Sequence, residues 1–146
     1  MLKRFSFWLW TASILQLLSA ALHSVSFFVD NPPANDTEKQ LDMLMKTYKL
    51  NLGAGFSPTM ADLMNSLSMG FMLLFVLAGV SNIYLWKQKI PVKTMKGVMA
   101  VNSLVFGACF LYAFTHAFII PVVCTGLVFV CCLVAYLSAG SDRLRS

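Results

Sequence analysis

The 146-residue chain is 58% hydrophobic and only 12% charged, with a formal net charge of +5 and a mean hydropathy of +0.73. Soluble domains carry about 25% charged residues, so this composition excludes a domain that covers itself with a water-facing surface. The basic residues lie beside apolar runs rather than among exposed aromatics, which excludes nucleic acid as an expected partner and is typical of membrane topology determinants. We expect one domain, residues 1–146, with the lipid bilayer as its main partner.

Four apolar stretches are long enough to cross a bilayer as helices, which takes about 20 residues. They cover about residues 6–29, 60–86, 94–113 and 121–139. The first stretch begins after Lys3 and Arg4 and contains Ser19-Ala20-Ala21, which resembles a signal-peptide cleavage site. Its apolar character continues beyond that site, so we expect a retained helix. The sequence predicts an all-α polytopic membrane protein built as a four-transmembrane-helix bundle.

The external loop, residues 30–57, is the only long polar segment. Proline follows Asn31 and ends the first helix. Thr37 and Gln40 have the spacing of a capping box. Apolar residues then recur at helical spacing, at Leu41, Leu44, Met45, Tyr48 and Leu52. We expect a short amphipathic helix ending near Gly53 that lies on the lipid interface, or alternatively covers the mouth of the bundle.

The second span begins with a helix-entry signal. Ser57 and Pro58 fit the N-cap and N1 positions, and Asp62 lies in the first turns, where a carboxylate suits the helix dipole. This helix is longer than a crossing needs, so its first turns are expected at the level of the lipid headgroups.

Positive charge is concentrated on one side of the predicted topology. Eight of the 11 basic residues fall on the side of the termini and the loop between spans two and three: Lys3, Arg4, Lys87, Lys89, Lys93, Lys96, Arg143 and Arg145. The positive-inside rule therefore predicts that both termini are cytoplasmic and that the long loop is outside.

Small and polar residues mark an inner face on each helix, because they permit close approach and interhelical hydrogen bonds. In the first span these are Ala12, Gln16, Ser19, Ala20, His23 and Ser26, opposite Trp8, Ile14, Leu15, Leu18 and Leu22. Gln16 and Asn102 lie near the expected midplane. They are candidate ligands for a buried polar substrate, but we favour a structural role in which they bond each other or a neighbouring carbonyl.

A second polar group is expected at the outer ends of spans one and two. It comprises His23, Asp62, Asn65 and Ser66. An intramembrane carboxylate needs a partner or a water-filled pocket. We therefore consider an outward-facing ligand pocket with a His23–Asp62 pair, against the simpler interpretation of a solvated helix-start acid and a packed histidine.

The cysteines and histidines give weaker signals. Cys109 and Cys124 are equidistant from the predicted turn between spans three and four, which makes them a candidate thiol pair, although buried cysteine usually acts as a small hydrophobe. No CxxC, HxxxH or HExxH motif is present, so no metal site and no cofactor is predicted.

The chain has a four-span layout, with His23-Ser24 at the end of the first span and the stretch YKLNLGAGFSPTMADLMNSLSMGF leading into the second span. In these features it resembles small bacterial four-span membrane proteins, and in size and layout it is similar to DoxX-like proteins. The resemblance implies a helical bundle in a bacterial inner membrane and carries no activity over.

We expect a non-enzymatic integral membrane protein that binds a lipid-like or small amphipathic ligand, or a membrane partner, at the outward-facing pocket. One alternative is a small membrane oxidoreductase or quinone-reactive protein that uses His23, Asp62 and the Cys109–Cys124 pair. Another is an oligomeric transporter or channel protomer, because one four-helix bundle encloses little space.

Overall fold

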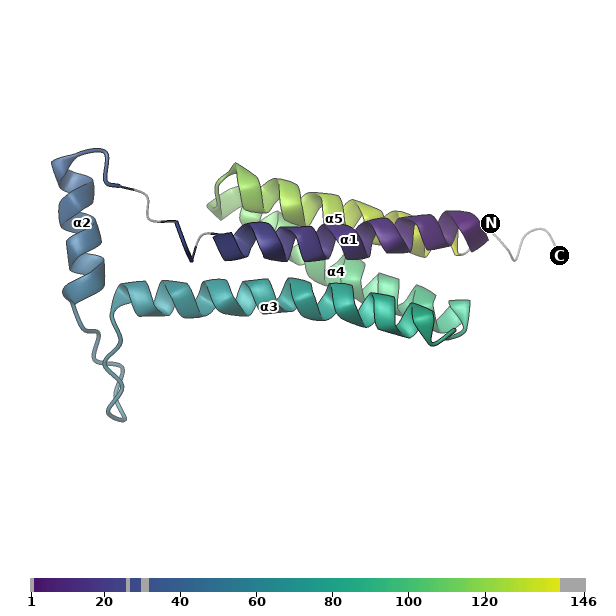
Figure 1. Cartoon of the computed structure of the whole chain (residues 1–146), viewed down its shortest axis with the longest axis horizontal. Coiled ribbons are helices and arrows are strands. Elements are labelled where there is room, and N and C mark those ends of the chain that lie inside the picture. Colours follow the sequence, from purple (N-terminus) through teal and green to yellow (C-terminus); the bar gives the residue numbers. More distant parts are fainter. Residues whose placement is uncertain (1, 26, 30–31, 140–146) are drawn as a thin grey trace. The chain divides into compact units, whose positions relative to one another are not determined.

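The protein is all-helical over the residues described by the computed structural model, which are 2–25, 27–29 and 32–139. Figure 1 shows the helices α1 (Leu2–Val25), α2 (Asp36–Thr47), α3 (Met60–Lys87), α4 (Val92–His116) and α5 (Ile119–Ser138). All but α2 are long and apolar enough to cross a membrane. The predicted fold class, four candidate spans with a short helix between the first two, is confirmed.

The helix bounds differ from the predicted spans at several ends. α1 ends at Val25 rather than at residue 29, and residues 27–29 continue as a turn in which Phe27 N donates to Ser24 O at 3.1 Å. α4 and α5 both begin two residues before the predicted spans. Hydropathy locates the hydrocarbon crossing, whereas a helix continues until its hydrogen-bond ladder is interrupted, which explains these differences.

The N-terminus of α2 is capped two residues earlier than predicted. Asn35, not Thr37, is the N-cap, and its Oδ1 accepts a hydrogen bond from Glu38 N at 2.9 Å. The Glu38 carboxylate reaches back to Ala34 N at 2.7 Å and to Asn35 Nδ2 at 3.0 Å. Asn35 and Glu38 therefore form a reciprocal pair like a capping box, and the charged glutamate suits the positive end of the helix.

The segment after α2 is a short hairpin rather than further helix. α2 ends at Thr47, so Tyr48 and Leu52 lie outside it, contrary to the predicted end near Gly53. Leu50 N donates to Pro58 O and Leu52 N to Phe56 O, while Gly53, Ala54 and Gly55 all have positive φ. Consecutive left-handed residues are incompatible with an α-helix, and glycine at two of these positions makes the turn accessible.

The chain forms two compact units, Ala21–Leu74 and a larger one that combines Met1–Ala20 with Phe75–Ser146. The larger unit holds the central apolar core. Its fully buried side chains include Phe75, Phe106, Leu9, Met95, Met99, Val128 and Cys132. The aromatic centre of this core is the pair Phe75 and Phe106, whose ring centroids lie 5.0 Å apart.

Glycine allows α4 and α5 to pack closely. A Cβ at Gly107 would lie 3.1 Å from the Phe129 ring, and one at Gly126 would lie 3.0 Å from the Phe110 ring. The two phenylalanine rings stack with an interplanar angle of 11°. Each ring therefore occupies the space left by the glycine of the opposite helix, as small-residue packing in membranes predicts.

The predicted inner face of α1 is buried. Ala12, Gln16, Ser19 and Ala20 are at most 7% exposed, whereas Ile14, Leu18 and Leu22 are about half exposed or more. His23 of the predicted inner face, and Trp8 and Leu15 of the opposite faces, are half-buried. Ser26 lies outside the described residues. The period of small and polar residues therefore identified the packed face of this helix correctly.

Candidate functional site

Asp62 acts in the structure as part of a helix cap. Thr59, rather than Ser57, is the residue before α3, and its Oγ1 accepts a hydrogen bond from Asp62 N at 3.1 Å. The Asp62 carboxylate accepts from both Thr59 N, at 2.9 Å, and Thr59 Oγ1, at 2.8 Å. This reciprocal pair has the form of a capping box, and it corrects the predicted Ser57–Pro58 start.

The other outer residues do not join Asp62 in one cluster. Ser66 Oγ donates to the Asp62 backbone carbonyl at 2.8 Å, and the Asn65 side chain is exposed. His23 packs edge-on against Phe71, with ring centroids 5.4 Å apart. Phe71 follows Asp62 by nine residues, which is about 13 Å along a helix axis. His23 and Asp62 thus lie at different levels of α3, and the predicted pair does not form here.

The midplane amides are linked through Asn82, which was not among the predicted site residues. Asn82 Nδ2 donates to Gln16 Oε1 at 3.0 Å, and Asn102 Nδ2 donates to Asn82 Oδ1 at 3.1 Å. Gln16 and Asn102 therefore bond the same asparagine rather than each other. We call Gln16, Asn82 and Asn102 the amide ladder; it joins α1, α3 and α4. Asn82 could have been predicted as a member of the ladder from its depth in the second span, which is similar to the depth of the other two amides.

The amide ladder has a direction. Asn102 Nδ2 also donates to Val98 O at 3.1 Å, so its amide nitrogen must face that carbonyl. This fixes the orientation of Asn82 and then of Gln16. The ladder ends at Gln16 Nε2, a buried donor with no hydrogen-bond partner among the described residues. Both Gln16 and Asn82 are fully buried, whereas Asn102 is half-buried, so the ladder serves the packing of the helices.

The cysteines are thiols. Cys109 on α4 and Cys124 on α5 are half-buried, and Cys131 and Cys132 are buried. Within the described ranges, no three His, Cys, Asp or Glu side chains gather closely enough to hold a metal ion.

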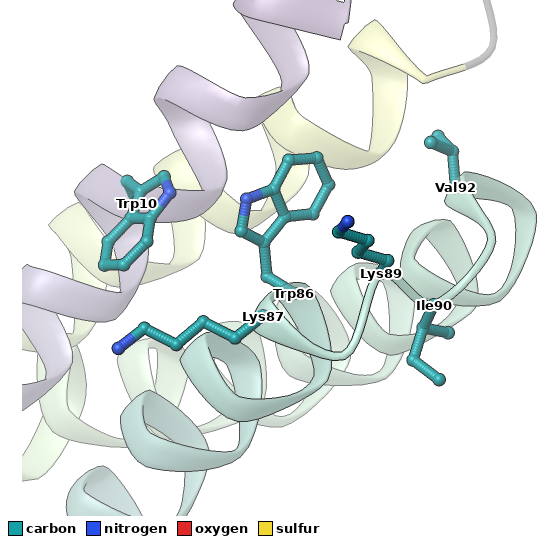
Figure 2. Close-up of a pocket in the computed structure, with 6 residues that line it drawn as sticks. All are labelled: Trp10, Trp86, Lys87, Lys89, Ile90 and Val92. Carbon is teal, nitrogen blue, oxygen red and sulfur yellow. The ribbon is translucent and has the colours of Figure 1, made fainter.

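A cavity of about 500 Å³ lies where α3 ends and α4 begins. We call it the Trp10–Trp86 cavity, and it is lined by Trp10, Trp86, Lys87, Lys89, Ile90 and Val92. Figure 2 shows Trp10 on α1 facing the end of α3, with Lys87 and Lys89 extending to either side of Trp86. Its volume falls within the range of about 300–1,000 Å³ that is typical of small-molecule sites.

The cavity is lined by two indole rings and has a positively charged rim. Trp86 is held by Phe5, with ring centroids 5.8 Å apart. Lys87 and Lys89 are exposed, while both tryptophans are half-buried. A span that ends in Trp-Lys is the sequence signal that was available for this site, because tryptophan and lysine gather at membrane interfaces. Comparison of the chain with family models, with curated proteins and with solved structures finds no match.

Proposed function

We propose that this chain is a non-enzymatic integral membrane protein that binds a lipid-like amphiphile in the Trp10–Trp86 cavity. The observation that carries this proposal is the lining of the cavity, which combines two indole rings with two exposed ammonium groups. An indole ring offers a large apolar surface together with one N–H donor. An amphiphile is the class of ligand that uses such a surface and a neighbouring charge at the same time.

The position of the cavity supports a ligand that belongs to the membrane. Trp86 and Lys87 are the last two residues of a helix that is long enough to cross a bilayer. Tryptophan and lysine at such a helix end occupy the headgroup level of the bilayer. A molecule bound there keeps its polar group at the interface and its tail among lipid chains.

The lining supports binding rather than catalysis. Among the described residues, the lining holds no carboxylate, imidazole, thiol or hydroxyl side chain, and its two lysines are exposed. We also propose that the membrane is a bacterial inner membrane and that both termini lie in the cytoplasm. The distribution of basic residues supports this orientation.

Native mass spectrometry of the protein released from nanodiscs tests this function. We expect retained phospholipid on the intact chain, and loss of most of it in the Trp10→Ala/Trp86→Ala variant. Trp8→Ala is the matched control, because Trp8 is a half-buried tryptophan on the same helix that does not line the cavity. Equal lipid retention by all three proteins would contradict the proposal.

A further inference from the structure

The Trp10–Trp86 cavity lies in a part of the chain that is poor in negative charge. Five of the six acidic residues lie between Asp30 and Asp62, and the sixth is Asp142. Among the described residues, the salt bridge is between Lys46 and Asp42, and no described carboxylate neutralises Lys87 or Lys89. Two uncompensated ammonium groups at the rim of one cavity attract an anion.

The neighbouring lysines differ from these two in what they contact. The Lys96 ammonium lies 4.8 Å from the centre of the Tyr136 ring, in a cation–π contact. Lys93 is exposed and does not line the cavity. Of the four lysines between α3 and the first turns of α4, Lys87 and Lys89 are therefore the pair that a ligand in the cavity would meet.

Lys89 occupies a backbone position that favours glycine. α3 ends in a Schellman motif, in which Lys89 N donates to Trp86 O at 3.0 Å and Ile90 N donates to Leu85 O at 3.4 Å. Lys89 is the left-handed residue of this motif, with φ of 55°. A residue with a side chain is strained there, and strain of this kind is concentrated at binding sites. Replacement of Lys89 by glycine would therefore remove the ammonium group without straining the turn.

We propose that the Trp10–Trp86 cavity binds the phosphate of an anionic phospholipid headgroup from the cytoplasmic leaflet. Lys87 and Lys89, which extend to either side of Trp86 (Figure 2), supply the positive charge that attracts the phosphate, and the Trp10 and Trp86 rings pack against the glycerol and the first part of the acyl chains. This inference rests on the proposed function and adds the chemical class of the ligand. Basic cavities between membrane helices on the cytoplasmic side are suited to such headgroups.

The test compares lipid retention in nanodiscs of phosphatidylcholine with nanodiscs that contain phosphatidylglycerol. We expect the wild-type chain to retain phosphatidylglycerol preferentially. A lysine near an anionic surface adds about 1 kcal/mol, or about fivefold in affinity, through the general surface potential, so Lys87→Gln/Lys89→Gln should lower this preference by more than the roughly thirtyfold that this potential alone would give for two lysines.

Lys93→Gln is the matched control, since it removes one charge from the same loop but leaves the lining intact. We expect its preference to fall by no more than about fivefold, which is the cost of removing one charge from the general surface potential. Lys89→Gly should lower the preference while the thermal midpoint stays equal or rises, because glycine suits the left-handed turn. A loss of preference with Lys93→Gln equal to that with Lys89→Gly would overturn the site.

The remaining outcomes separate this inference from the proposed function. Retention of both lipids without preference, still dependent on Trp10 and Trp86, would refute the anionic headgroup and leave the amphiphile function standing. Lipid retention that is independent of both tryptophans would refute the function itself. Displacement of phosphatidylglycerol by millimolar inorganic phosphate would identify a site for the free anion and would overturn the lipid as its source.

Discussion

Asn82 lies between Gln16 and Asn102 and bonds both, so that one buried amide joins α3 to α1 on one side and to α4 on the other. The bond to Gln16 connects two fully buried side chains that are 66 residues apart in the chain. In a bilayer the apolar side chains of neighbouring helices gain little by leaving lipid, so interhelical packing and hydrogen bonds carry the association. The amide ladder is therefore a principal determinant of how these three helices meet.

Replacement of Asn82 by leucine should destabilise the protein by about 1–2 kcal/mol, because it removes two interhelical hydrogen bonds and strands the Gln16 amide in an apolar interior. Unfolding in a mixed-micelle titration with SDS measures this loss. Asn102→Leu should cost less, since Asn82 keeps its bond to Gln16. Asn65→Leu on the same helix is the control, because the Asn65 side chain is exposed. An equal effect at residues 65 and 82 would contradict the role of the ladder.

Gly79 lies where α3 packs closely against α1. A Cβ placed on it would lie 3.1 Å from the backbone oxygen of Ser13 and 3.0 Å from Leu17 Cγ. The carbonyl cannot move without its helix, so Gly79→Ala should destabilise the protein by about 1–3 kcal/mol.

Gly70→Ala tests the same substitution elsewhere on α3, where no heavy atom lies within 4 Å of the added methyl group. It should be neutral or stabilising by up to about 1 kcal/mol, because alanine is the better helix former. The SDS titration applies to both variants. A destabilising Gly70→Ala together with a neutral Gly79→Ala would contradict the close packing of α3 against α1 at Gly79.

The capping pair Thr59 and Asp62 should hold the first turn of α3. Thr59→Ala should cost about 1 kcal/mol locally, which corresponds to about fivefold faster amide exchange over residues 60–64. Asp62→Ala should have a similar effect, and Thr59→Ser, which keeps the hydroxyl group, should retain the wild-type protection of these amides from exchange. Hydrogen exchange with mass spectrometry reads out this turn directly.

Ser57→Ala is the informative control for the cap, because sequence alone assigned the N-cap to Ser57. We expect no change in exchange with this variant. Faster exchange in Ser57→Ala than in Thr59→Ala would return the cap to Ser57. A loss of ligand binding in Asp62→Ala that Thr59→Ala does not share would support the outer site predicted from sequence.

The orientation can be measured with two reporters. A fluorescent protein fused after residue 146 should fold in the cytoplasm and fluoresce, and alkaline phosphatase inserted at the Gly53–Gly55 turn should be active outside. The physical reason is the excess of lysine and arginine beside the termini and between α3 and α4. The opposite pair of signals would place the Trp10–Trp86 cavity in the outer leaflet.

Sequence alone determined the features that depend on local composition and period. Apolar length marked the four long helices, and the spacing of Ala12, Gln16, Ser19 and Ala20 identified the buried face of α1. Both follow because a helix in lipid must satisfy its own backbone and can only choose which face to pack.

The tertiary structure alone decided which residues meet. Sequence placed Gln16 and Asn102 at a similar depth but could not show that Asn82 stands between them, because helix rotation and partner choice are set by the whole interface. For the same reason the predicted cluster of His23 and Asp62 separated into an aromatic contact and a helix cap. The Trp10–Trp86 cavity likewise depends on the meeting of two helices and a Schellman turn, and no single stretch of sequence specifies that meeting.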